Sequence, residues 1–261
     1  MDTSSTVRKL FNKVPEITLY FWIIKILCTT VGETAADFLN TNLNLGLTGT
    51  SIIMSILLII TLFFQFKAKK YIPSIYWTAV VLISIVGTLI TDNLTDNFGV
   101  SLVTTTIIFS IVLAVVFALW HKIEGTLSIH TINKMRREGF YWLAILFTFA
   151  LGTAAGDLTA EQLNLGYFVS LILFASLIAI VTVAHLKFKL NAVLSFWIAY
   201  ILTRPLGASI GDFLSQDKSS GGLGLGPVVT SGMFLFAILI TVIYLTVTKK
   251  DAVAVEEEAL G

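Results

Sequence analysis

The sequence predicts an all-α integral membrane protein whose eight transmembrane helices form four parallel helical-hairpin repeats. Of its 261 residues, 56% are hydrophobic and only 13% are charged, against about 25% charged residues in soluble domains. The mean hydropathy is +0.89. Eight apolar segments approach or exceed the roughly 20 residues that cross a hydrocarbon core, and every second segment carries the same short pattern.

The predicted spans follow one another along the chain with short joins. The longest join, from His121 to Glu138, cannot hold a soluble domain. The first span follows a basic segment, as a signal peptide would, but it carries the repeated pattern and is expected to be retained. Pro205 is expected to kink the seventh span, because proline removes a backbone donor. The spans cover residues 17–37, 43–66, 71–92, 98–120, 139–157, 163–184, 190–212 and 223–248.

The spans define one transmembrane domain, at residues 14–248. Its four repeats are predicted at about 14–70, 71–137, 138–189 and 190–248. Trp22 and Trp142 are 120 residues apart, as are Trp77 and Trp197, which predicts two four-helix halves. Residues 1–13 are expected to be a cytoplasmic N-terminal segment, and residues 249–261 an acidic cytoplasmic tail.

Basic residues are sorted between the two faces of the membrane. Of the 17 lysines and arginines, 14 lie before the first span, after the eighth, or in the joins that follow the second, fourth and sixth spans. Cytoplasmic loops carry an excess of lysine and arginine. We therefore expect both termini to lie in the cytoplasm.

The pattern W-x9-G-x4-D occurs four times, once in each odd-numbered span. Because each unit crosses the membrane twice, all four units enter from the same side, as parallel repeats about an axis along the membrane normal. The repeat is the strongest signal in the sequence. Its members are Trp22, Trp77, Trp142 and Trp197, then Gly32, Gly87, Gly152 and Gly207, then Asp37, Asp92, Asp157 and Asp212.

This organisation resembles a bacterial polytopic membrane-protein family built from four tandem two-transmembrane repeats of unknown function. The resemblance covers residues from about 14 to 248, and the pattern is complete in every copy. It implies a multi-pass protein of the bacterial cytoplasmic (inner) membrane. It implies no activity, so function must be inferred from the residues themselves.

Glycine and aspartate are expected to have different roles in each repeat. At about 100° per residue they lie roughly 140° apart around a helix. The glycines, with the tryptophans, are expected to serve close packing between helices, as small residues do in membranes. The aspartates place an acid at the same depth in every copy, toward the predicted outer face.

Two interpretations of these acids are open: they cap helices at the water interface, or they line a shared cavity. The identical spacing, the presence of Glu33 one turn deeper and the presence of two deeper cations favour the cavity, because intramembrane charges usually face a bundle interior or an aqueous path. Oxygen-bearing neighbours one turn either side of the aspartates are Thr88, Asp96, Thr153 and Glu161.

The two deeper cations are Lys25 and Arg204, which are expected to have a supporting or gating role. Arg204 lies about 6 Å below the level of Glu33, at 1.5 Å per residue. We expect an Arg204–Glu33 ion pair if the first and seventh spans are neighbours. An ion pair that only fixes the packing is the alternative.

The residue types at the acidic level suit hard cations. Carboxylate and hydroxyl oxygens are ligands for Mg²⁺, Mn²⁺ or Ca²⁺, and they also carry protons. The four aspartates are therefore candidate metal ligands. His121, His130 and His185 lie near the predicted cytoplasmic face, and Cys28 has no partner for a disulfide in its own chain.

The sequence therefore predicts a transporter of a hard cation such as Mn²⁺ or Mg²⁺, open to proton coupling, with its site formed by Asp37, Asp92, Asp157, Asp212 and Glu33. No phosphate loop, HExxH or GxSxG motif is present, so no enzyme activity, catalytic residue or cofactor is expected. Expected partners are membrane lipid and a small ion or solute, without nucleic acid, and a homo-oligomer is left open. The alternatives are an ion channel, an anion carrier using Lys25 and Arg204, a membrane-embedded enzyme with acidic groups, and a structural or sensory protein.

Overall fold

The computed structural model describes residues 12–42 and 45–251, and these residues form helices and short links without a strand. All eight long helices have the length and apolar character needed to cross a membrane, which confirms the predicted all-α membrane fold. The predicted N-terminal segment and acidic tail lie mostly outside the described residues. The helices are α2 (Leu19–Asp37), α3 (Gly46–Lys67), α4 (Pro73–Asp92), α5 (Leu102–Glu124), α6 (Met135–Asp157), α7 (Tyr167–Phe188), α8 (Ala192–Ser215) and α9 (Gly226–Thr248).

The helices form an inner and an outer layer. In α2, α4, α6 and α8 the most apolar stretch is 56% to 72% buried within the protein, whereas in α3, α5, α7 and α9 it is only 11% to 22% buried. The outer helices carry the highest hydropathy, as expected of surfaces that face lipid. The inner helices are the four that carry the W-x9-G-x4-D pattern.

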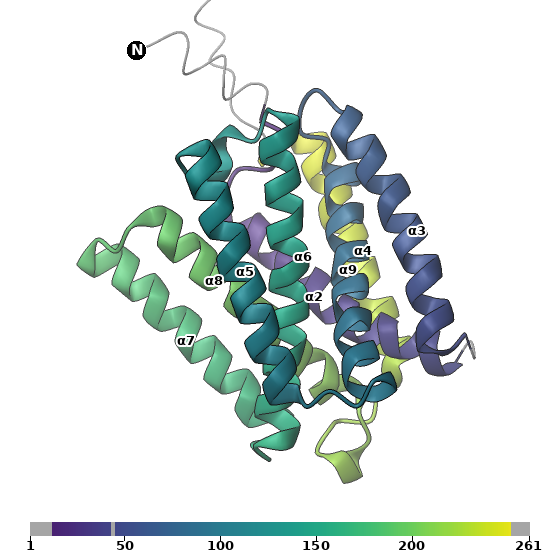
Figure 1. Ribbon diagram of the computed structural model, residues 1–261. Helices are drawn as coiled ribbons and strands as arrows, with labels where there is room; N and C mark the ends of the chain where they lie inside the picture. Colours follow the sequence, from purple (N-terminus) through teal and green to yellow (C-terminus); the bar gives the residue numbers. More distant parts are fainter. Residues whose placement is uncertain (1–11, 43–44, 252–261) are drawn as a thin grey trace, which may run out of the picture.

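The inner helices close into a ring. Helix α2 packs against α4 and α8, and α6 packs against the same two helices. Each outer helix packs mainly on the inner helix of the following repeat: α3 on α4, α5 on α6, α7 on α8 and α9 on α2. Figure 1 shows α7 beside α8 at one side of the bundle and α3 beside α4 at the other. The two sequence halves are therefore joined into one continuous ring through the α4–α6 and α8–α2 contacts.

The pattern glycines occupy the same position in all four repeats, and this ring gives that position a steric cause. A Cβ atom on Gly32 would overlap the side chain of Ser84, and one on Gly87 would lie 2.6 Å from Cβ of Phe149. One on Gly152 would overlap the Arg204 side chain. In each case the contact residue lies on the next inner helix, three positions before that helix's own glycine. The glycines therefore set the close approach of neighbouring inner helices, as predicted for small residues in membranes.

The tryptophans also pack between repeats. Each pattern tryptophan contacts the aromatic residue that precedes the tryptophan of the previous repeat. The four ring pairs are Phe21–Trp77, Tyr76–Trp142, Tyr141–Trp197 and Phe196–Trp22, with centroids 5.5 to 6.3 Å apart. This repeated contact ties the ring together near the end of the bundle that carries the basic joins, which we call the basic end.

The sequence misplaced several helix ends. The outer helices begin at Gly46, Leu102, Tyr167 and Gly226 instead of 43, 98, 163 and 223. The links before them turn at glycines with positive φ, which include Gly99 (66°) and Gly166 (75°), a conformation that glycine adopts without a steric penalty. Helix α8 runs through Pro205 as one helix to Ser215.

Three inner helices continue beyond their aspartate. A π-helical segment follows α2 (Phe38–Asn42), α4 (Asn93–Asn97) and α6 (Leu158–Gln162). The sequence-based spans ended at the aspartate because the residues that follow are mostly polar, although their backbone remains helical. The acids therefore lie about one turn inside the helical structure, at what we call the acidic end of the bundle.

At the basic end, a polar network joins the two ends of the described chain. The Glu16 amide donates to the Asp251 carbonyl at 2.9 Å. The Tyr71 hydroxyl donates to the Asp251 carboxylate at 2.5 Å and accepts from Nε1 of Trp77 at 3.0 Å. Burial raises the pKa of the Asp251 carboxyl, and the hydrogen bond from Tyr71 offsets only part of that effect.

Candidate functional site

The four aspartates of the repeat converge on one cavity at the acidic end. The cavity has a volume of about 170 Å³, and seven of its lining residues carry carboxyl groups. Its lining consists of Glu33, Asp37, Asp92, Thr95, Asp96, Leu102, Asp157, Glu161, Asp212 and Gln216. Each inner helix contributes its pattern aspartate, so the cavity lies on the axis of the ring.

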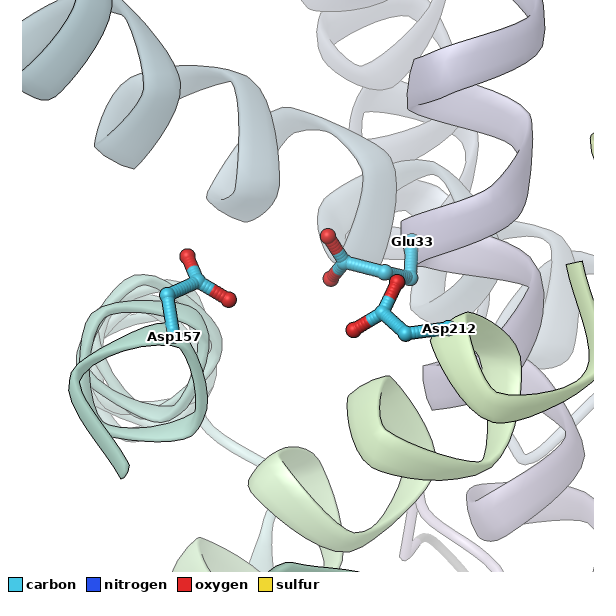
Figure 2. Close-up of side chains that lie close together, drawn as sticks. All are labelled: Glu33, Asp157 and Asp212. Atoms are coloured by element: carbon cyan, nitrogen blue, oxygen red, sulfur yellow. The ribbon is translucent and has the colours of Figure 1, made fainter. Parts of the chain in front are cut away.

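The tightest part of the cluster is formed by Glu33, Asp157 and Asp212. One carboxylate oxygen from each lies within 4.8 Å of the other two. Figure 2 shows the three side chains pointing toward one another from α2, α6 and α8. Asp37 and Asp92 line the same cavity without belonging to this group. The structure therefore brings together two of the four predicted aspartate ligands, with Glu33 as the third member.

Asp96 and Glu161, predicted to support the site, lie at its more exposed rim. Both are exposed residues of the π-helical segments. The Glu161 carboxylate accepts a hydrogen bond from the Tyr167 hydroxyl at 3.2 Å. The cavity is thus acidic from its rim to its floor.

Arg204 lies beneath the cavity and pairs with Glu33, one of the residues that line it. Its guanidinium is fully buried and donates from Nη2 to the Glu33 carboxylate at 2.9 Å. The same nitrogen donates to the Thr153 hydroxyl at 2.7 Å and to the Thr88 hydroxyl, while Nη1 donates to the Thr29 carbonyl at 3.3 Å. The expected Arg204–Glu33 ion pair is present. The same guanidinium is the hydrogen-bond partner of Thr88 and Thr153, the two threonines predicted to support the site.

The depth of each side chain follows from a spacing of four residues along every inner helix. Residues four apart lie on nearly the same face of a helix. Going from the aspartates toward the basic end, the first level holds Glu33, Thr88 and Thr153. The second level holds Phe149 and Arg204. Arg204 reaches up one level, which is why it can bind oxygens from three other inner helices.

Lys25 lies one level further toward the basic end. Its side chain is 1% exposed, and Nζ lies 4.1 Å from the ring centre of Phe149 and 4.2 Å from that of Tyr200. Nζ has no hydrogen-bond partner among the described residues. The predicted deep cation is therefore present, but aromatic faces surround it instead of carboxylates.

An aromatic layer closes the ring beneath Lys25. It consists of the residues that precede the four tryptophans, and all of them are buried. The Tyr76 and Tyr141 hydroxyls share a hydrogen bond of 2.5 Å between the neighbouring helices α4 and α6. The members of this layer are Phe21, Tyr76, Tyr141 and Phe196.

Sequence reasoning missed this layer, and it also missed Phe149 and Tyr200. The signal for the layer was present, because each pattern tryptophan is preceded by an aromatic residue. Phe149 and Tyr200 gave no comparable signal, since the equivalent positions of the other repeats hold different residue types. Their relation to Lys25 depends on the order of the helices around the ring.

Two larger cavities flank the half of α8 nearest the basic end. One, of about 490 Å³, lies between α2, α7 and α8 and is lined in part by His130 and His185. The other, of about 510 Å³, lies between α5 and α8 and is lined in part by His121. Both are mainly apolar and remote from the carboxylates. The acidic cavity, although smaller, is the one whose chemistry is built from the repeated pattern.

The arrangement of the acidic cavity favours cations over anions. Its polar lining atoms are almost all oxygens of carboxyl, hydroxyl and amide groups, which are hard ligands. The one guanidinium beneath them already donates to Glu33 and two threonines. An anion entering the cavity would meet carboxylates before it reached Arg204.

Comparisons with known proteins agree with the fourfold organisation. No curated protein and no solved structure matches the chain. Four consecutive segments match a family repeat, at residues 20–71, 75–126, 140–190 and 195–251. Each segment covers most of one inner helix and all of the outer helix that follows it. The chain is a multi-pass membrane protein that belongs to the family described as Repeat of Unknown Function (DUF347).

Proposed function

We propose that this protein transports a hard divalent cation, such as Mn²⁺, Mg²⁺ or Ca²⁺, and binds it in the acidic cavity. The observation that carries the proposal is the convergence of Glu33, Asp157 and Asp212, whose oxygens lie within 4.8 Å of one another. Three carboxylates held this close inside a bundle repel one another unless cations or protons neutralise them. A divalent cation would do so most directly.

The spacing allows one ion to contact all three carboxylates. Two oxygens on opposite sides of one ion are separated by twice the metal–oxygen distance, about 4.6 to 5.2 Å for Ca²⁺ and about 4.0 to 4.2 Å for Mg²⁺. The three oxygens lie within 4.8 Å of one another, which is compatible with an ion of either size.

A carrier fits the axis of the ring better than an open channel. Beneath the cavity the axis is occupied in turn by Arg204, Lys25 and the aromatic layer. A cation could leave toward the basic end only if these side chains moved. The same barrier makes the cavity accessible from one end at a time, which is the requirement for alternating access.

We place the acidic end at the outer face of a bacterial cytoplasmic membrane. The support is the positive-inside rule, because the basic end holds Lys67, Lys69 and Lys70 at and after the end of α3 and Lys187 and Lys189 near the end of α7. The cation site would then open outward in the conformation described.

Cation binding by purified protein tests the proposal. Thermal melts in detergent would compare Mg²⁺, Mn²⁺ and Ca²⁺ with Na⁺ and K⁺, for the wild type and for Asp157→Asn and Asp212→Asn. We expect one or more divalent ions to raise Tm in the wild type and to lose that effect in both variants. Asp217→Asn is the matched control, because Asp217 is an exposed acid in the next link and does not line the cavity.

A second measurement distinguishes transport from binding. Protein in liposomes that contain an ion-sensitive dye would be exposed to the stabilising ion, and uptake would be compared with that of Asp212→Asn. An absence of any cation effect on Tm, together with equal behaviour of all three variants, would contradict the proposal. It would favour helix capping as the role of the acids.

A further inference from the structure

Lys25 occupies an unusual environment for a cation within the membrane. Its Nζ atom is enclosed by the Phe149 and Tyr200 rings, at 4.1 and 4.2 Å from their centres, and has no hydrogen-bond partner among the described residues. An ammonium group there is held by cation–π attraction alone. Buried lysines without an anionic partner change their protonation state readily.

Arg204 adds a permanent positive charge to the same surroundings. Its guanidinium carbon lies 5.6 Å from the centre of the Phe149 ring that Lys25 also contacts. Two positive charges on one ring repel each other strongly where water is excluded. Glu33 reduces this repulsion, because its carboxylate pairs with Arg204 at 2.9 Å.

Among the described residues of the inner helices, no carboxylate lies at the level of Lys25. Helix α9, which also packs on α2, contributes one titratable residue, Tyr244, and that residue contacts Tyr20 toward the basic end. The titratable and charged groups on the neighbouring faces are Cys28 and Glu33 on α2, Tyr76 on α4, Tyr141 on α6, and Tyr200 and Arg204 on α8.

We propose that Lys25 exchanges a proton for the cation that enters the acidic cavity. This inference rests on the proposed cation transport. When a cation binds to the Glu33 carboxylate, that carboxylate neutralises Arg204 less completely, and the repulsion between Arg204 and Lys25 grows. The N–H bond of the ammonium then breaks, the proton passes to water, and a neutral amine remains between the two rings.

The linkage acts in both directions. If a bound cation promotes proton loss from Lys25, then protonation of Lys25 weakens cation binding by the same factor. A proton taken up from one side of the membrane would thus release the cation on that side. The protein would exchange cations for protons, and Lys25 would set the coupling without touching the cation.

Proton release on cation binding tests the assignment. Mn²⁺ is added to purified protein in weakly buffered detergent solution with a pH-indicator dye, and the protons released per bound Mn²⁺ are counted. Lys25→Arg keeps the charge but cannot give up its proton, and Lys25→Met removes the charge at similar size. Both variants are expected to bind Mn²⁺ and to release fewer protons, by up to about one per bound ion.

The control is Cys28→Ala, which changes a buried residue one turn along the same helix and should release as many protons as the wild type. Equal proton release from the wild type and Lys25→Arg, with Mn²⁺ bound to both, would overturn the assignment. A Lys25→Met variant that fails to fold does not prevent this comparison, because Lys25→Arg provides it independently.

Liposome assays separate this inference from the proposed function. Exchange of Mn²⁺ for Mn²⁺ across the membrane requires no net proton movement, whereas accumulation driven by a pH gradient does. We expect Lys25→Met to retain the exchange and to lose the accumulation. Gradient-driven accumulation equal to that of the wild type would overturn the role of Lys25 alone. A wild-type protein that neither binds nor exchanges Mn²⁺ would overturn cation transport, and the role of Lys25 with it.

Discussion

Gly207 of α8 packs against Thr29 of α2, and this contact joins the last repeat of the chain to the first. A Cβ atom on Gly207 would lie 2.5 Å from Cβ of Thr29 and 3.0 Å from the Thr30 amide nitrogen. Neither atom can move away by rotation of a side chain. The same relation holds at the other three inner-helix contacts, so the ring closes by repetition of one interface.

Substitution of Gly207 by alanine is therefore expected to strain the α8–α2 contact. Forcing extra methyl groups into a packed interior typically costs about 1 to 3 kcal/mol, and we expect a fall in Tm for Gly207→Ala. Gly232→Ala is the matched control, because a Cβ atom on Gly232 would meet nothing within 4 Å. Equal Tm values for the two variants would show that the backbones can separate without cost.

Removal of the carboxylate from Glu33 is expected to leave Arg204 buried and incompletely neutralised. Breaking a buried ion pair by removing one partner costs about 3 to 5 kcal/mol, so Glu33→Gln should lower the free energy of unfolding by several kcal/mol. The double variant Glu33→Gln, Arg204→Met should recover part of this loss. Denaturant titration in mixed detergent compares both variants with the wild type.

The pair of Arg136 and Glu124 provides the control for these variants. Arg136 is 65% exposed, and the Glu124 carboxylate that it contacts at 2.6 Å also pairs with Arg137 at 3.5 Å, so the loss of Arg136 leaves that carboxylate with a cation. Arg136→Gln should therefore change stability little. A loss from Glu33→Gln no larger than that from Arg136→Gln would show that water reaches Arg204.

The hydroxyl pair in the aromatic layer makes a separate prediction. Tyr141→Phe leaves the buried Tyr76 hydroxyl without its 2.5 Å partner, and an unsatisfied buried polar group costs about 1 to 3 kcal/mol. The double variant Tyr76→Phe, Tyr141→Phe removes both groups and should be closer to the wild type in Tm. Tyr20→Phe, near the exposed Tyr244, should have little effect. A double variant less stable than Tyr141→Phe would contradict this account.

Asp251 makes stability depend on pH at the basic end. Burial raises the pKa of its carboxyl in the folded protein, so the folded state holds this proton more tightly than the unfolded chain does. The stabilisation is complete at low pH and is lost as pH rises through the folded-state pKa. Asp251→Asn has no such proton, so the wild type should lose Tm relative to this variant as pH rises above the ordinary aspartate pKa of about 3.9.

Thermal melts at several pH values check this expectation. The comparison with the wild type is repeated for Asp217→Asn, which makes the same substitution at an exposed acid and controls for it. A constant difference between the wild type and Asp251→Asn would contradict the role assigned to Asp251.

The fold was largely predictable because the repeat is chemically simple. An apolar length of about 20 residues specifies a membrane helix, and the W-x9-G-x4-D spacing identifies which helices resemble one another. The convergence of Asp37, Asp92, Asp157 and Asp212 on one cavity was an expectation that the four equal spacings supported. The Arg204–Glu33 pair was also expected, from depth alone.

What could not be predicted depends on the order of helices around the ring. Depth along a helix follows from sequence spacing, whereas neighbours across the ring do not. The sequence therefore could not show that Asp157 and Asp212 lie closest to Glu33, or that Lys25 meets Phe149 and Tyr200. It also could not show that α9 covers α2, because these helices lie at opposite ends of the chain.

The packing of α9 on α2 has a consequence for how the chain assembles in the bilayer. Of the described helices, α2 is made first and its outer cover, α9, is made last, so α2 stays uncovered on that side until synthesis of α9 is complete. The earlier repeats must remain in the membrane as an open arc whose free edge is α2. The Glu16 amide nitrogen and the Asp251 carbonyl oxygen lie only 2.9 Å apart. The order of the repeats in the gene, more than the structure, therefore determines where in the ring the chain begins and ends. A circular permutant that starts at the second repeat and links residues 251 and 12 should rebuild the same ring.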